Sequence, residues 1–71
     1  MTVIVKQYEN ENYYISLEIT TRYDRSIYLV QVYEMINGKP NGYPIREFSY
    51  PNAEKQKALA TYRRYIKRYC S

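Results

Sequence analysis

The last third of the chain carries apolar and basic side chains at the spacing of an α-helix. The segment from about 53 to 69 contains no proline or glycine. If successive residues are rotated by about 100°, its apolar side chains fall within an arc of roughly 120°. These apolar residues are Ala58, Leu59, Tyr62, Tyr65, Ile66 and Tyr69. Asn52 is expected to cap the helix, and Glu54 is expected in its first turn, where the helix dipole favours an acid. A helix with one apolar stripe needs an apolar surface to pack on, and the preceding residues have to supply it.

Four segments before this helix have the residue pattern of β-strands. Their approximate bounds are 2–8, 12–20, 26–36 and 43–50. The second segment alternates, and the residues that it turns to one side are Tyr13, Ile15, Leu17 and Ile19. The third segment is apolar on both faces, which indicates a central strand. Two Asn-Gly pairs within 37–42 favour a wide connection there, and Pro44 marks the last segment as an edge strand or a strand start.

These segments together predict one α+β domain over residues 1–71. The expected sheet is an antiparallel meander of three or four strands, with the C-terminal amphipathic helix packed on one face. A chain of 71 residues has room for a single core. Eleven of its residues are Tyr, and this side chain suits both the border of a thin core and a contact surface.

One helix covers only one face of such a sheet, so an apolar face is expected to stay open. The open set is either Leu29, Tyr33 and Met35 or Tyr28, Val30 and Ile36, and the pattern leaves both alternatives open. The residues expected at a protein interface are Tyr14, Leu29, Tyr33 and Met35. In the other interpretation, tyrosines lying along the sheet simply shield its aliphatic side chains.

The residue types present argue against catalysis and metal binding. The chain has no His and one Cys, Cys70, so neither a Cys-His pair nor an intramolecular disulfide can form. Glu18, Glu34 and Glu47 could share a sheet face, but cross-strand Lys or Arg neighbours are expected to explain them. The prediction is therefore a protein that is not an enzyme, with no catalytic residue, metal or cofactor. No apolar run approaches the length of about 20 residues that spans a membrane, so a cytoplasmic location is expected.

Positive charge is concentrated in the predicted helix. From Asn52 onward there are six Lys or Arg and one Glu, a net of +5, whereas the preceding residues carry five bases and six acids, a net of −1. Such a face can neutralise phosphates, and the residues expected to do so are Lys57, Arg63, Arg64, Lys67 and Arg68. The secondary contacts are expected from Arg22, Arg25 and Lys39. A simpler explanation is that cations late in a helix stabilise its negative end and that its outer face has to be polar.

The sequence therefore favours a small non-catalytic binding module whose partner is nucleic acid or an acidic, nucleic-acid-handling protein. No RNA-binding aromatic motif, zinc finger or helix-turn-helix pattern narrows this further. The alternative is a small inhibitor or adaptor that occludes a partner protein, of the type encoded by phages and mobile elements, which includes anti-CRISPR proteins. A homodimer through the open sheet face is compatible with either function.

Overall fold

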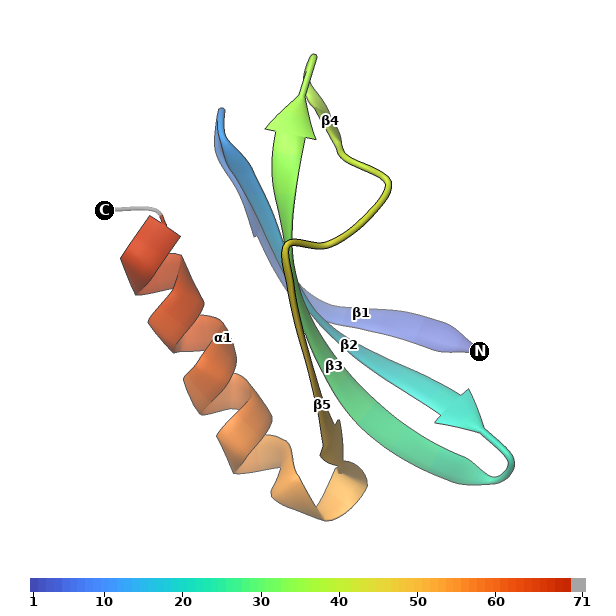
Figure 1. Cartoon of the computed structure of the whole chain (residues 1–71). Helices are drawn as coiled ribbons and strands as arrows, with labels where there is room; N and C mark the ends of the chain where they lie inside the picture. The colour runs from blue at the N-terminus through green and yellow to red at the C-terminus, as the bar shows by residue number, and fades with distance from the viewer. Residues whose placement is uncertain (70–71) are drawn as a thin grey trace.

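The predicted α+β fold is confirmed by the computed structural model, which describes residues 1–69 and, for Arg22, the backbone alone. An antiparallel sheet is followed by one C-terminal helix (Figure 1). The strands are β1 (Thr2–Glu9), β2 (Tyr13–Arg22), β3 (Arg25–Ile36), β4 (Lys39–Pro40) and β5 (Arg46–Pro51). A 3₁₀ turn, η1 (Asn52–Glu54), leads into the helix α1 (Lys55–Tyr69).

The central strand of the sheet is β3, as the sequence predicts. It pairs with β2 along one edge, and with β5 and the short β4 along the other, while β1 lies outside β2. The long strands bend, and α1 lies along the outer side of the bend (Figure 1). The sheet therefore has one face covered by α1 and one face on the inner side of the bend, which is called the open face below.

The core lies between α1 and the covered face of the sheet. Leu17 of β2 is paired with Val30 of β3, which is paired with Phe48 of β5. The buried apolar residues are Ile15, Leu17, Tyr28, Val30, Val32, Ala58, Tyr62 and Tyr65. The sequence left open which face of the third strand meets the helix. Tyr28 and Val30 face α1, and the alternating set with Leu29 lies on the open face. Thr61 is also buried, and its Oγ1 lies 2.5 Å from the Tyr50 hydroxyl oxygen, a hydrogen bond that joins α1 to β5.

The wide connection expected over 37–42 is wrong. Ile36 pairs directly with Lys39, so Asn37 and Gly38 alone form a two-residue turn between β3 and β4. Their φ angles are 55° and 80°, the left-handed conformation that Asn and Gly tolerate and that matches the twist of a hairpin. As a result, the last long strand begins at Arg46, three residues later than predicted.

The expected helix cap is also wrong. Pro51 occupies the N-cap position with extended backbone, φ −59° and ψ 157°, and no side chain caps the turn that follows. Asn52 is already the first residue of η1, because the chain leaves the strand conformation only after Pro51. Glu54 lies in η1, one residue before α1, so the first turn of α1 itself contains no acid.

The turn at Gly38 gives a direct test of this part of the fold. Gly38→Ala is expected to lower the free energy of unfolding by about 1 to 2 kcal/mol, because the left-handed conformation disfavours a Cβ. Gly42→Ala is the matched control, since neither glycine has a neighbouring atom within 4 Å of an added Cβ and only Gly38 has positive φ. Urea denaturation of both variants measures the difference. Equal effects would contradict the two-residue turn.

Candidate nucleic-acid interface

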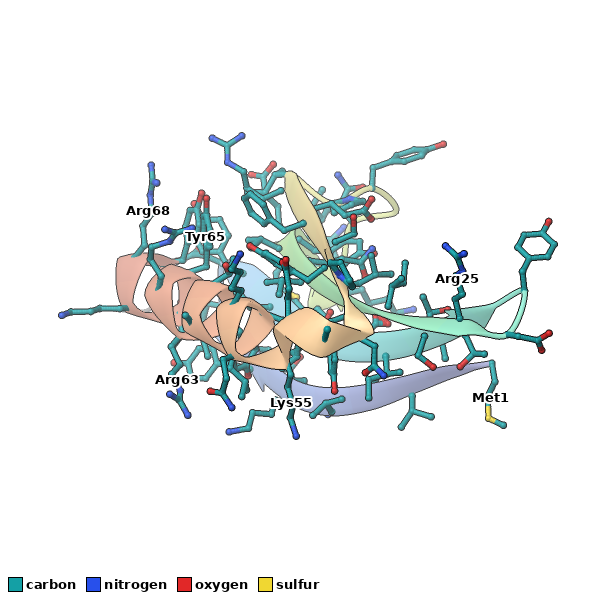
Figure 2. All side chains as sticks on the ribbon, turned by 90° about the horizontal axis from the view of Figure 1, so that it is seen from below. Met1, Arg25, Lys55, Arg63, Tyr65 and Arg68 are labelled. Atoms are coloured by element: carbon teal, nitrogen blue, oxygen red, sulfur yellow. The ribbon has the colours of Figure 1, made fainter. Side chains whose placement is uncertain are left out.

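The cations of α1 lie on the side of the helix that points away from the core. These exposed residues, called the helix surface below, are Lys55, Lys57, Arg63, Arg64, Lys67 and Arg68. They are spread around the outer half of the helix rather than forming one row. In Figure 2, Arg68 extends toward the β5 side, whereas Arg63 and Lys55 extend toward the β1 side. The helix surface can therefore contact a partner over a broad, curved area.

These cations are almost free of acidic partners. Over residues 1–69, with the Arg22 side chain left aside, the one ion pair joins Lys57 Nζ to Glu54 Oε1 at 3.5 Å, within the first turns of the helical segment. No acid of the sheet pairs with the helix surface in this part of the chain. Apart from Lys57, the positive charge of the helix surface is therefore not neutralised by an ion pair in the described residues.

Two guanidinium groups of the helix surface rest on tyrosine rings. The Arg64 guanidinium carbon lies 5.5 Å from the centroid of the Tyr65 ring, and that of Arg68 lies 6.0 Å from Tyr65 and 5.7 Å from Tyr69. The rings of Tyr65 and Tyr69 are themselves stacked, 5.8 Å apart with 16° between their planes. Cation–π contacts of this kind restrict the arginine side chains.

The positive surface and its aromatic support continue onto β5. Arg46, which the sequence analysis did not single out, is the cation there. Phe48 packs against Tyr65 at 5.3 Å between ring centroids. Arg46, two residues earlier on the strand, is paired with the buried Val32, so it lies on the same covered side of the sheet and is itself exposed. The alternation of Arg46 and Phe48 was the available signal, but only the strand register places Arg46 on the side of the sheet that α1 covers.

The secondary cations predicted from the sequence do not join the helix surface. Arg25 lies at the first residue of β3, and Lys39 is paired with Ile36 at the last. Eleven residues of extended strand separate those two positions, about 36 Å if the strand were straight. Figure 2 shows Arg25 at the end of the molecule opposite Arg63 and Arg68. The side chain of Arg22 lies outside the described residues.

The four residues predicted at a protein interface all lie on the open face. Tyr14 is paired with Tyr33, and their rings form an edge-to-face contact with centroids 6.1 Å apart. Leu29 alternates with the buried Tyr28 and Val30, and Met35, six residues further along β3, shares its face. All four are half-buried. The open face thus has an aromatic centre that α1 does not cover.

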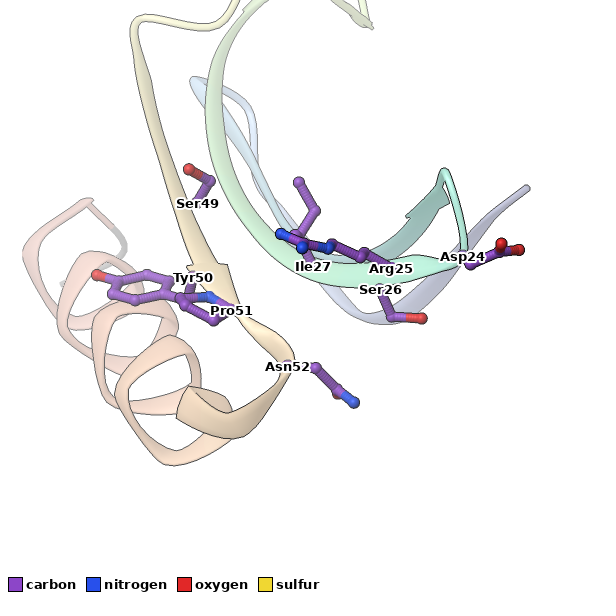
Figure 3. Close-up of a pocket in the computed structure, with 8 residues that line it drawn as sticks. All are labelled: Asp24, Arg25, Ser26, Ile27, Ser49, Tyr50, Pro51 and Asn52. Atoms are coloured by element: carbon purple, nitrogen blue, oxygen red, sulfur yellow. The ribbon is translucent and has the colours of Figure 1, made fainter.

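A hollow of about 560 Å³ lies at one end of the open face, beside the start of η1. Its lining residues are Asp24, Arg25, Ser26, Ile27, Ser49, Tyr50, Pro51 and Asn52. Figure 3 shows Arg25 and Ile27 pointing into the inner side of the bend, while Tyr50 points toward α1. Among residues 1–69, no group of three or more His, Cys, Asp or Glu side chains is placed to hold a metal ion.

Comparisons of the chain with protein-family models, curated proteins and solved structures gave no match. In the part of the chain that the structure describes, none of the helical segments has both the length and the apolar character needed to cross a bilayer. Interpretation of function therefore depends on the two surfaces themselves.

Proposed function

We propose that this chain is a non-catalytic binding module that contacts nucleic acid through the helix surface. The observation that carries the proposal is the set of exposed cations on α1 that no acid of the sheet neutralises. Lys and Arg side chains that stay free of protein partners can replace the counterions condensed on a phosphate backbone, and this exchange supplies most of the affinity of sequence-independent binding.

The arginine and tyrosine contacts support the same function. Arg64 and Arg68 are held over Tyr65 and Tyr69, so less side-chain freedom is lost when each guanidinium binds a phosphate. The planar guanidinium presents two parallel N–H groups that match two phosphate oxygens. Tyr65 is 8% exposed and belongs to the core, so the platform under these arginines is rigid. Arg46 extends the positive surface onto the sheet.

The salt dependence of affinity tests this proposal. If three or four phosphates are engaged, the logarithm of the association constant for duplex DNA is expected to fall with the logarithm of salt concentration at a slope of about −3. Fluorescence anisotropy with a labelled duplex and a labelled single-stranded RNA measures the slope for both classes. Affinity that is independent of salt, or no binding to either probe at low salt, would contradict a phosphate-binding helix.

A second candidate function is a protein-binding inhibitor or adaptor that uses the open face. The paired rings of Tyr14 and Tyr33 favour it, because half-buried aromatic side chains are typical anchors of protein interfaces. In that case, Tyr33→Ala would weaken partner binding more than neutralising the helix surface. The opposite ranking supports nucleic acid.

A further inference from the structure

The open face carries acidic side chains around its two tyrosines. Glu9 is paired with Tyr14, Glu18 with Leu29 and Glu47 with Gln31, and all three lie on this face. The expectation that Lys or Arg neighbours explain Glu18 and Glu47 is wrong, because their cross-strand neighbours are Ile4, Leu29 and Gln31.

The expectation that Glu18, Glu34 and Glu47 share one sheet face is also wrong. Glu34 is paired with Tyr13 and lies on the covered side, so it does not share a face with Glu18 and Glu47. Of the side chains described, the one Lys or Arg that the register places on the open face is Arg25, at the β2–β3 turn. It forms no ion pair with these carboxylates. The acidic character of this face is therefore uncompensated.

The pKa values of the two phenol groups are raised by burial and by these acids. Burial raises the pKa of Tyr14, and the nearby charges of Glu18 and Glu9 raise it further. Burial also raises the pKa of Tyr33, followed by the charges of Glu18 and Glu47. The negative charge of the carboxylates thus reaches both rings, and each ring adds the negative potential of its own face.

A buried hydroxyl on the same face has unused hydrogen-bonding capacity. Ser16 is 1% exposed, and in the part of the chain that the structure describes its Oγ has no hydrogen-bond partner. It lies between Tyr14 and Glu18 along β2 and is paired with Gln31. Buried polar groups normally have a partner, so the unpaired hydroxyl next to Tyr14 on this face is an acceptor that a donor from a ligand can use.

We propose that the open face around Tyr14, Tyr33, Glu18 and Glu47 is a docking surface for an arginine-bearing segment of a partner protein. A guanidinium stacks on aromatic rings, donates to carboxylates in pairs and carries an aliphatic stem that can pack on Leu29. Charge complementarity selects this occupant, because the phosphates of nucleic acid would be repelled from an acidic face. The surface is distinct from the helix surface, so this proposal gives the partner chemistry of the second candidate function and is independent of nucleic-acid binding.

An oligoarginine peptide of about nine residues is the direct probe. The whole chain carries +4, so long-range electrostatics oppose this peptide and binding reports an acidic site. Isothermal titration calorimetry at low salt is expected to detect binding, with an oligolysine peptide of equal length bound more weakly because Lys lacks the planar group.

A matched pair of double variants locates the site. Glu18→Gln with Glu47→Gln is expected to weaken oligoarginine binding about tenfold. The control, Glu11→Gln with Glu34→Gln, removes two exposed acids, one in the β1–β2 turn and one on the covered side, and gives the same net charge. It is expected to change affinity less than about twofold. Nucleic-acid affinity is expected to be similar in the two double variants, which separates this test from the helix surface.

Three results would overturn the proposal. The first is no binding of oligoarginine to the unmodified chain at low salt, and the second is an equal loss of affinity in both double variants. The third is self-association that sedimentation detects and that Glu18→Gln with Glu47→Gln abolishes. That result would assign the open face to the cationic helix of a second copy instead of a partner protein.

Discussion

Replacing Arg64, Lys67 and Arg68 with Gln is expected to weaken nucleic-acid binding about 100-fold at physiological salt, because each phosphate contact contributes about a factor of five through counterion release. The slope of log affinity against log salt is expected to fall from about −3 toward zero in the same variant. The helix propensity of Gln is close to that of Lys and Arg, so α1 is expected to remain folded. Anisotropy titrations and circular dichroism of the same samples measure both properties.

The control for this experiment removes the same number of charges from the sheet. Lys6→Gln, Arg25→Gln and Lys39→Gln lower the net charge from +4 to +1, as the helix variant does, but all three residues lie outside the helix surface. This control is expected to lose less than about fivefold in affinity. If the two triple variants weaken binding equally, net charge rather than the helix surface determines affinity, and the proposed interface is wrong.

Leu17→Ala is expected to lower the free energy of unfolding by about 3 kcal/mol, because it opens a cavity between the sheet and α1. Leu17 is 1% exposed and is paired with Val30, which is fully buried. A chain of this size is stabilised by only about 4 to 10 kcal/mol in total, so the loss is a large fraction of the whole. Urea denaturation followed by circular dichroism measures the change.

Leu29→Ala is the matched control for the covered face. Leu29 is on the strand beside Leu17 but points to the open face, where it is half-buried. Its truncation is expected to cost about 1 kcal/mol, since solvent and neighbouring side chains can fill the space. A larger cost for Leu29 than for Leu17 would mean that the core lies on the other face of the sheet.

The helix and the order of the strands were predictable because their signals are local. The stripe that contains Tyr62 and Tyr65 repeats at 3.6 residues, and Ile15 and Leu17 alternate with polar residues. The bend between β2 and β3 was not predictable as a two-residue turn. This turn places Tyr23 and Asp24 at φ 51° and 63°. A bulky Tyr rarely adopts this conformation, so the residue types gave no signal for a two-residue turn.

The face of β3 that meets α1 depends on strand register, which the apolar residues of β3 do not specify. Pairing of Leu17 with Val30 puts Val30 in the core and leaves Leu29 on the open face. A shift of one residue would exchange the two faces, and both would still be apolar. The open face could therefore be expected from the sequence, but its residues could not be assigned.

The position of one acid of the open face, Glu9, depends on an irregularity that composition does not reveal. The register of β1 against β2 shifts between Ile4 and Lys6. Without this bulge, Glu9 would pair with Tyr13 on the covered side; with it, Glu9 pairs with Tyr14 on the open face. The charge of the helix surface was predictable because it depends on one segment. The charge of the open face was not, because the acids that lie on it are determined by the register of four strands.

The most direct test of the central claim is amide and arginine side-chain chemical-shift mapping of the labelled chain during titration with a short DNA duplex. A nucleic-acid-binding helix surface predicts changes at Arg64, Lys67 and Arg68, with smaller changes on the neighbouring part of β5 and little change at Tyr14 and Tyr33. Changes concentrated on Tyr14 and Tyr33, with α1 unaffected, would contradict it.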